Sequence, residues 1–79
     1  MEITVKLFAS LGAYAPDKKS ARPFPFEIEE GATLKKLIQK LDIPEEIVKL
    51  KFVNGRTRNF DYPLKTGDEV GFFPPIGGG

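Results

Sequence analysis

Few side chains in this sequence could perform chemistry without help from another molecule. The chain has no cysteine and no histidine, which removes the thiolate nucleophile, the commonest general base and the commonest transition-metal ligand. The two serines, Ser10 and Ser20, have no imidazole to activate them. Three carboxylate pairs remain, and each fits a solvated turn or helix start: Glu29–Glu30, Glu45–Glu46 and Asp68–Glu69. We therefore expect no catalytic residue and no metal site, and a chain that is not an enzyme by itself.

The C-terminal stretch FFPPIGGG, residues 72–79, offers a different kind of chemistry. Three terminal glycines arise by chance in roughly one chain in three thousand, and here they follow a proline pair that favours an extended path. Glycine has no Cβ, so the last residues form a thin thread that could enter a narrow tunnel in another protein. Counted from Pro74, six residues reach at most about 20 Å.

The thread presents the α-carboxylate of Gly79, which is ionised at neutral pH and is a poor electrophile. It must be activated, for example as a mixed anhydride with AMP, before a sulfur or amine nucleophile can capture the acyl group. Ordering the thread costs about 1–2 kcal/mol per residue, and an apolar patch beside it could offset that cost. The candidates for this docking patch are Phe8, Phe73, Pro74, Pro75 and Ile76.

The composition of the chain indicates one small folded domain. It has 79 residues, of which 41% are hydrophobic and 29% charged, as in globular rather than disordered proteins. A net charge of +1 gives no reason to expect nucleic-acid or membrane partners. There is no apolar run long enough to span a bilayer and no signal-peptide layout at the N-terminus, so we expect a cytoplasmic protein.

Alternating apolar residues predict strands over residues 2–9, 24–29, 50–53 and 69–73. Asn54-Gly55 is a strong hairpin signal, because both residues tolerate positive φ, and a short return limb should follow it over residues 56–60. A loop is expected from Ser10 to Pro23, where small, charged and proline residues gather.

One main helix is predicted after Thr33, which is a suitable N-cap. Its apolar stripe has helical spacing and consists of Leu34, Leu37, Ile38 and Leu41. Pro44 suits the first turn of a second, shorter helical segment over residues 45–49.

This order of elements predicts an α+β fold, in which a mixed sheet of four to five strands carries the helix on its apolar face. In the β-grasp (ubiquitin-like) arrangement, the first and last strands lie side by side at the centre. The domain would span residues 1–73, and residues 74–79 would form a flexible C-terminal tail. Phe8 and Phe73 would then project from the open face as a docking patch. The alternative is that the loop over residues 10–23 folds over both rings.

The segments KLFASL, VNG and PLKTGDEVGFFPPIGGG resemble the ubiquitin-like sulfur carriers of the MoaD/ThiS type. Within that family the chain is most similar to the small subunits of molybdopterin synthase. The resemblance covers essentially the whole chain. Its most specific element is the aromatic pair, proline pair and terminal glycines that follow GDEV.

The resemblance implies a terminal glycine that is adenylated by a ubiquitin-activating-like enzyme using ATP and then converted to a thiocarboxylate by a sulfur donor system. Gly79 would carry the adenylate and then the sulfur, while Gly77, Gly78 and Gly79 would lie inside the large subunit of molybdopterin synthase. There the tail would deliver sulfur to the dithiolene of the pterin. The resemblance implies no cofactor bound to the chain itself.

Three alternatives stay open at the level of sequence. The sulfur acceptor could instead be thiamine thiazole or a tRNA base. The chain could be a ubiquitin-like protein modifier, in which Gly79 forms an isopeptide with a lysine of a target. It could also be a plain interaction module with an inert tail. The first two classes need the same activated carboxylate, so the sequence does not separate them.

Overall fold

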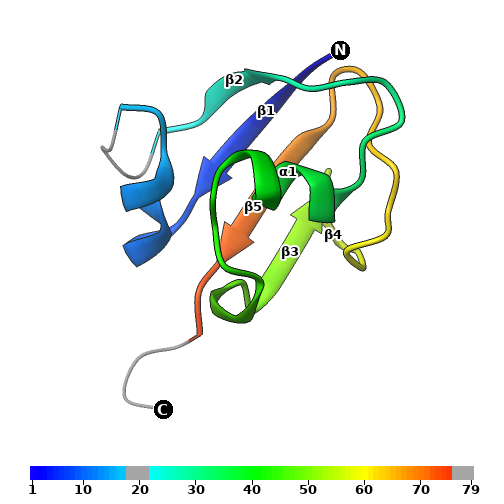
Figure 1. The fold of residues 1–79 in the computed structure, drawn as a ribbon. Helices are drawn as coiled ribbons and strands as arrows, with labels where there is room; N and C mark the ends of the chain where they lie inside the picture. The colour runs from blue at the N-terminus through cyan, green and yellow to red at the C-terminus, as the bar shows by residue number, and fades with distance from the viewer. Residues whose placement is uncertain (18–21, 76–79) are drawn as a thin grey trace.

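A computed structural model describes residues 1–17 and 22–75 of the chain. Its five strands form one mixed sheet in the order β2-β1-β5-β3-β4, and helix α1 lies across one face of that sheet (Figure 1). The strands are β1 (Glu2–Leu7), β2 (Phe24–Glu27), β3 (Leu50–Val53), β4 (Arg56–Thr57) and β5 (Glu69–Phe73). The helices are α1 (Leu34–Lys40) and the 3-10 helices η1 (Ala9–Tyr14) and η2 (Glu45–Ile47). The predicted α+β class, with one main helix and a short second helical segment, is confirmed.

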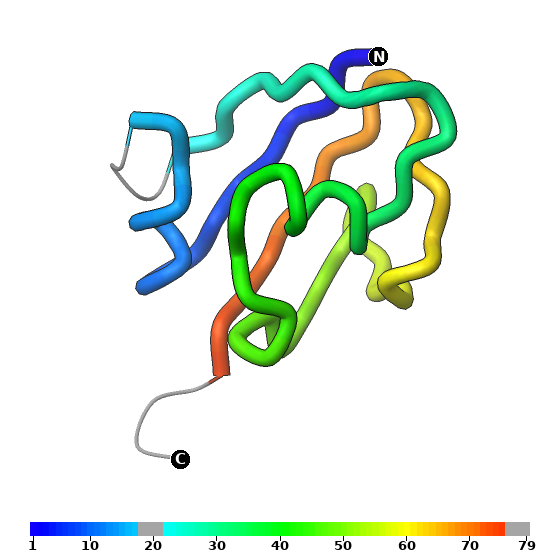
Figure 2. Tube along the Cα trace, in the orientation of Figure 1, coloured from blue at the N-terminus to red at the C-terminus, as the bar shows by residue number. Residues whose placement is uncertain are grey.

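Strands β1 and β5 run parallel to each other at the centre of the sheet, as predicted (Figure 2). Val5 pairs with Val70 and Leu7 pairs with Phe72, and all four side chains are buried under α1. Because side chains alternate along a strand, this register sends the intervening residues to the open face of the sheet.

Thr33 is the N-cap of helix α1, and its Oγ1 accepts a hydrogen bond from the Lys36 N–H at 3.2 Å. Two more N–H groups at the N-terminus of α1 donate hydrogen bonds to carbonyl groups of the loop that precedes β5. Leu34 N–H donates to Tyr62 O at 3.1 Å, and Lys35 N–H donates to Phe60 O at 2.9 Å. The predicted apolar stripe is buried in full, from Leu34 through Leu37 and Ile38 to Leu41.

The hairpin between β3 and β4 turns at Asn54 and Gly55, with φ values of 53° and 83°, as the sequence predicts. Asn54 also bonds to the segment before β5. Its Nδ2 donates to Asp68 Oδ1 at 2.9 Å, and its Oδ1 accepts from Glu69 N–H at 2.9 Å. The second oxygen of Asp68 accepts from Lys65 N–H at 2.8 Å. Asp68 is buried, and these bonds satisfy its carboxylate.

Several element boundaries differ from the predictions. The first strand ends at Leu7, not at residue 9, because Ala9 adopts a positive φ of 52° and turns the chain. Strand β2 ends at Glu27, two residues before the predicted end, and β4 contains only Arg56 and Thr57. The second helical segment is a single 3-10 turn that ends at Ile47.

The prediction of a loop over residues 10–23 was wrong in its first part. Residues Ala9–Tyr14 form η1, which lies beside the end of β1 (Figure 1). Leu11 is 1% exposed and Ala15 is 5% exposed, so this segment contributes to the core. The apolar residues Leu11 and Ala15, spaced at i and i+4, were the available sequence signal for a helical turn, and the small and polar residues around them obscured it.

Replacing Asp68 by alanine should lower the free energy of unfolding by about 1–3 kcal/mol. The change leaves the Asn54 amide and the Lys65 N–H without their buried acceptor. Urea denaturation followed by circular dichroism measures the loss. Asp61→Ala is the control, because that carboxylate is exposed, and it should change stability by less than about 0.5 kcal/mol. Equal effects of the two variants would contradict the buried-acceptor role.

Candidate functional site

The rings of Phe8 and Phe73 stack on the open face of the sheet. Their centroids are 3.9 Å apart and their planes differ by 8°. The contact follows from topology, because Leu7 pairs with Phe72 and each phenylalanine is the next residue of its parallel chain segment. Phe8 N–H continues the pairing by donating to Phe72 O at 3.0 Å. Both rings are half-buried. The structure thus brings together the two aromatic residues that the sequence analysis singled out.

Phe52 is a third member of this cluster, and the sequence analysis missed it. Its ring meets Phe73 edge-on, with 5.7 Å between centroids and 78° between planes. Phe52 pairs with Gly71 across β3 and β5, which places it on the open face. The alternation within β3 was the available signal, since Val53 is buried under the helix and Phe52 must therefore face the other way.

The three rings surround a hollow of about 540 Å³, which we call the aromatic groove. Its lining includes Phe8, Phe52, Gly71 and Phe73, together with the polar or charged residues Thr4, Lys6 and Glu69 and with Pro23, Gly55 and Val70. The ammonium of Lys6 lies 4.7 Å from the centroid of the Phe8 ring, a cation–π distance.

Gly71 makes room for the ring stack. A Cβ at this position would lie 3.2 Å from Cε2 of Phe8, closer than most real Cβ contacts. Leu50 pairs with Phe73 on the other side and keeps 42% of its surface exposed, so the apolar surface continues onto β3. The open face is therefore apolar next to the point where the C-terminal segment leaves the sheet.

That exit point is fixed by a hydrogen bond from Lys49 N–H to Phe73 O at 2.8 Å. Pro74, which follows, is half-buried, and Pro75 is exposed. The remaining predicted site residues, Ile76 and residues 77–79, lie outside the described part of the chain. Their proposed roles in docking, tail insertion and covalent chemistry therefore stay predictions.

The alternative that residues 10–23 cover the aromatic rings finds little support in the described part of that segment. Pro23 lines the aromatic groove, but Phe8 and Phe73 each keep part of their surface exposed. Residues 18–21 lie outside the description. Residues 1–17 and 22–75 thus leave the rings of the groove partly open to solvent.

Glu29, which belongs to the first of the three carboxylate pairs considered for catalysis, forms ion pairs with two lysines of α1. Glu29 lies 3.8 Å from Lys36 Nζ and 4.0 Å from Lys40 Nζ. A hydrogen bond from the backbone lowers the pKa of Glu29, and the two lysines add to the effect, so the ionised form is favoured rather than the protonated form that a general acid requires. Within residues 1–17 and 22–75, no group of three His, Cys, Asp or Glu side chains is placed to hold a metal ion. No helix in that part of the chain is long and apolar enough to cross a bilayer.

Comparison with known proteins places this geometry in a family. The model of the ThiS family matches residues 5–79, which include the three phenylalanines of the aromatic groove and the terminal glycines. The chain belongs to the ThiS family. The resemblance to the MoaD/ThiS type, drawn above from the C-terminal motif, is confirmed.

A curated relative of this ThiS-family chain is the molybdopterin synthase sulfur carrier subunit of Escherichia coli (strain K12), with 57% identity over 30 residues. The match covers 38% of this chain and 37% of that protein, so it spans little more than a third of either.

Solved structures share the fold over its whole extent. A putative molybdopterin converting factor, subunit 1, from Pyrococcus furiosus is 30% identical, with a TM-score of 0.74 and coverage of 96% of this chain and 99% of that one. The complex of subunits 1 and 2 of molybdopterin-converting factor from Helicobacter pylori contains a chain that is 27% identical, with a TM-score of 0.61 and full coverage of both chains. Small archaeal modifier protein 1 of Haloferax volcanii, at 21% identity, has a TM-score of 0.72 and coverage of 95% and 98%. These neighbours confirm the predicted β-grasp, ubiquitin-like fold.

Replacing Gly71 by valine should displace the Phe8 ring from Phe73 without unfolding the ThiS-family domain. Valine suits a strand, but its Cβ and methyl groups would occupy the space beside Phe8. The loss of nuclear Overhauser contacts between the two rings measures the displacement. Glu69→Val is the control, because it places the same side chain on the same face of β5 at a position that already carries a full side chain. Persistence of the ring contacts in Gly71→Val would show that Gly71 has no part in forming the stack.

Proposed function

We propose that this ThiS-family protein is a sulfur carrier and the small subunit of molybdopterin synthase. It performs no catalysis by itself. A ubiquitin-activating-like enzyme adenylates Gly79 with ATP, and a sulfur donor system converts the adenylate to a thiocarboxylate. The observation that carries the proposal is the stacked pair Phe8–Phe73, which lies on an accessible apolar face at the root of a tail that ends in three glycines.

The chemistry of the proposal proceeds in two steps at the terminal carboxyl group. The carboxylate of Gly79 attacks the α-phosphate of ATP, pyrophosphate leaves, and an acyl adenylate forms. A sulfide-equivalent nucleophile from the donor system then attacks the acyl carbon and displaces AMP. The thiocarboxylate sulfur then bonds to the pterin, and water attacks the acyl carbon, which breaks the acyl–sulfur bond, leaves the sulfur on the pterin and returns the tail to a carboxylate. Because ATP drives the first step, we place the reaction in the cytoplasm.

The aromatic groove offsets part of the cost of ordering this tail, because its three rings are only half-buried in the free protein. Ordering six residues in a partner's tunnel costs on the order of 6–12 kcal/mol. Burying a phenylalanine side chain recovers about 1.5–3 kcal/mol. Phe8, Phe52 and Phe73 already hold one another in place, so a partner gains this burial without ordering the rings first.

The proposed partner in sulfur delivery is the large subunit of molybdopterin synthase. Support comes from the Helicobacter pylori complex, whose name pairs subunit 1 with subunit 2 of molybdopterin-converting factor. The curated relative from Escherichia coli is itself a sulfur carrier subunit of molybdopterin synthase. The family match that reaches the last glycine supports the role of Gly79.

Incubating the protein with ATP, a sulfur donor and its cognate activating enzyme should raise its intact mass by the difference between sulfur and oxygen. Mass spectrometry should map the change to Gly79, and the variant that lacks Gly79 should show none. A branched adduct on lysines of other proteins would instead favour a protein modifier. If neither a thiocarboxylate nor a trapped adenylate forms, the proposed function is wrong.

Phe8→Ala should weaken binding to the large subunit by about tenfold or more, since buried aromatic residues at the centre of an interface carry much of its energy. Isothermal titration calorimetry measures the affinity. Phe26→Ala is the matched control, because this half-buried ring packs against the core from the edge strand β2. If folded Phe8→Ala binds the large subunit with wild-type affinity, the aromatic groove is not part of the interface.

A further inference from the structure

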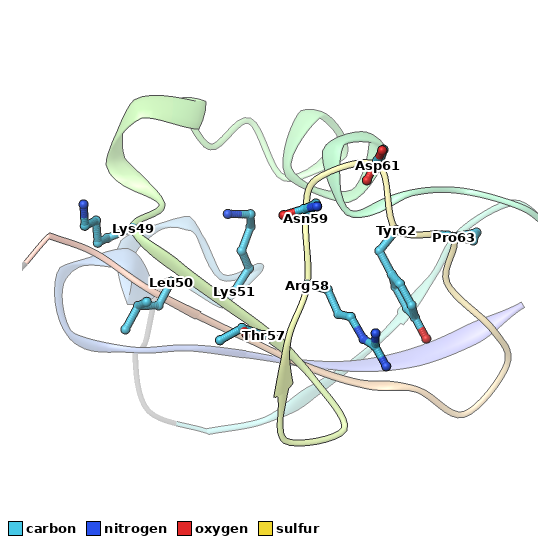
Figure 3. Close-up of a pocket in the computed structure, with 9 residues that line it drawn as sticks. All are labelled: Lys49, Leu50, Lys51, Thr57, Arg58, Asn59, Asp61, Tyr62 and Pro63. Atoms are coloured by element: carbon cyan, nitrogen blue, oxygen red, sulfur yellow. The ribbon is translucent and has the colours of Figure 1, made fainter.

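A second hollow lies at the edge of the sheet formed by β3 and β4, and the proposed function leaves it without a role. It has a volume of about 500 Å³ and lies between β3 and the loop that follows β4 (Figure 3). Three cations line it, namely Lys49, Lys51 and Arg58. We call this hollow the basic groove. Its cations come from two segments that the hairpin turn at Asn54-Gly55 brings side by side.

The walls of the basic groove are held by backbone hydrogen bonds. Arg58 N–H donates to Lys51 O at 3.1 Å and joins the loop to β3. Tyr62 N–H donates to Asn59 O at 3.0 Å and closes the turn of the loop. The same loop bonds to the first turn of α1 through the carbonyls of Phe60 and Tyr62. The groove is thus part of the folded frame of the domain.

Two of the cations lie over aromatic rings that limit their motion. Lys51 Nζ is 4.4 Å from the centroid of the Phe60 ring, and Arg58 Cζ is 4.7 Å from that of Tyr62. Figure 3 shows Arg58 beside Tyr62 and Lys51 rising from β3 toward the loop. A side chain that is already positioned loses less conformational entropy when it binds a ligand.

The positive charge of the basic groove is not neutralised within the described residues. None of Lys49, Lys51 and Arg58 forms an ion pair with a carboxylate in that part of the chain. Asp61 also lines the groove, but its carboxylate points away from the Lys51 ammonium (Figure 3). The chemistry that complements this surface is an anion, and in particular a group of carboxylates.

The basic groove lies next to the point where the tail leaves the sheet. Leu50 lines the groove and pairs with Phe73, and the Lys49 N–H holds the Phe73 carbonyl. The basic groove therefore begins where the tail leaves the sheet and where the aromatic groove ends. A nucleic acid is disfavoured, because the rings of Phe60 and Tyr62 are covered by cations instead of being free for base stacking.

We propose that the basic groove binds an acidic segment, rich in glutamate or aspartate, of the protein partner that receives the tail. The identity of that partner rests on the proposed function, whereas the preference of the groove for carboxylates does not. The cations increase the rate of encounter with the partner and fix its orientation, so that the apolar contacts and the tail can engage next.

A nuclear magnetic resonance titration with a short polyglutamate peptide at low salt tests the chemistry of the groove. Amide shifts should concentrate in residues 49–51 and 57–62 and should disappear at high salt. The double variant K51Q/R58Q should bind the peptide about tenfold more weakly. The control K36Q/K40Q removes the same charge from α1 and should bind like the wild type.

Shifts centred on the helix lysines, or unchanged binding by K51Q/R58Q, would overturn the proposal. Tighter binding of a single-stranded RNA oligonucleotide in the same groove would overturn it in favour of a nucleic-acid site. Circular dichroism should first show that both double variants are folded, and Arg58→Lys, which keeps the charge, should retain most of the peptide binding.

The second measurement follows the association of the protein with the large subunit of molybdopterin synthase by stopped-flow fluorescence. K51Q/R58Q should associate about tenfold more slowly than the wild type at low salt, with a weaker dependence on salt. Equal rates and salt dependence would overturn the role of the groove while the proposed function stands. If the wild type does not bind the large subunit, the proposed function fails, and the peptide titration still decides whether the groove binds carboxylates.

Discussion

The parallel pairing of β1 with β5 is the contact on which the rest of the molecule depends. It joins the two ends of the domain through bonds such as Thr4 N–H to Asp68 O at 2.9 Å, and it places both strands at the centre of the sheet. One side of the pair buries Val5 and Val70 beneath the helix. On the opposite side of the sheet, the same pairing places the rings of Phe8 and Phe73 against each other. A single register therefore determines both the core and the apolar surface.

The aromatic groove and the basic groove both lie next to the point where the tail leaves the sheet. They differ in chemistry because different elements form them. The aromatic groove is built from the central strands and from Phe52 on β3, so its geometry follows from the sheet. The basic groove depends on the hairpin and on the loop whose carbonyls bond to the N-terminus of α1. Asp68 and Asn54 connect these parts, since their hydrogen bonds tie the hairpin to the start of β5.

Elements with strong periodic patterns and the pairing of the two central strands could be predicted from the sequence, whereas the contacts of the short strands and of the loop after β4 could not. The last strand was predicted to the residue, and the stripe of α1 and the turn at Asn54 were also correct, because each depends on local spacing or local φ preference. Phe52 was missed because its strand is only four residues long and its orientation is decided by pairing with β5. The cations at Lys51 and Arg58 gather only after the hairpin forms, so no spacing along the chain indicates their groove.

The hydrogen bond between Lys49 N–H and Phe73 O fixes the point at which the C-terminal segment leaves the sheet. Every residue after that anchored carbonyl adds at most about 3.3–3.6 Å to the reach of the chain. Inserting or deleting one residue between Phe73 and the terminus would shift the final carboxylate by that increment relative to the body. Under the proposed function, a partner that holds the body at the aromatic groove keeps its reacting atoms at one matching depth, so the two partners are constrained to change in length together.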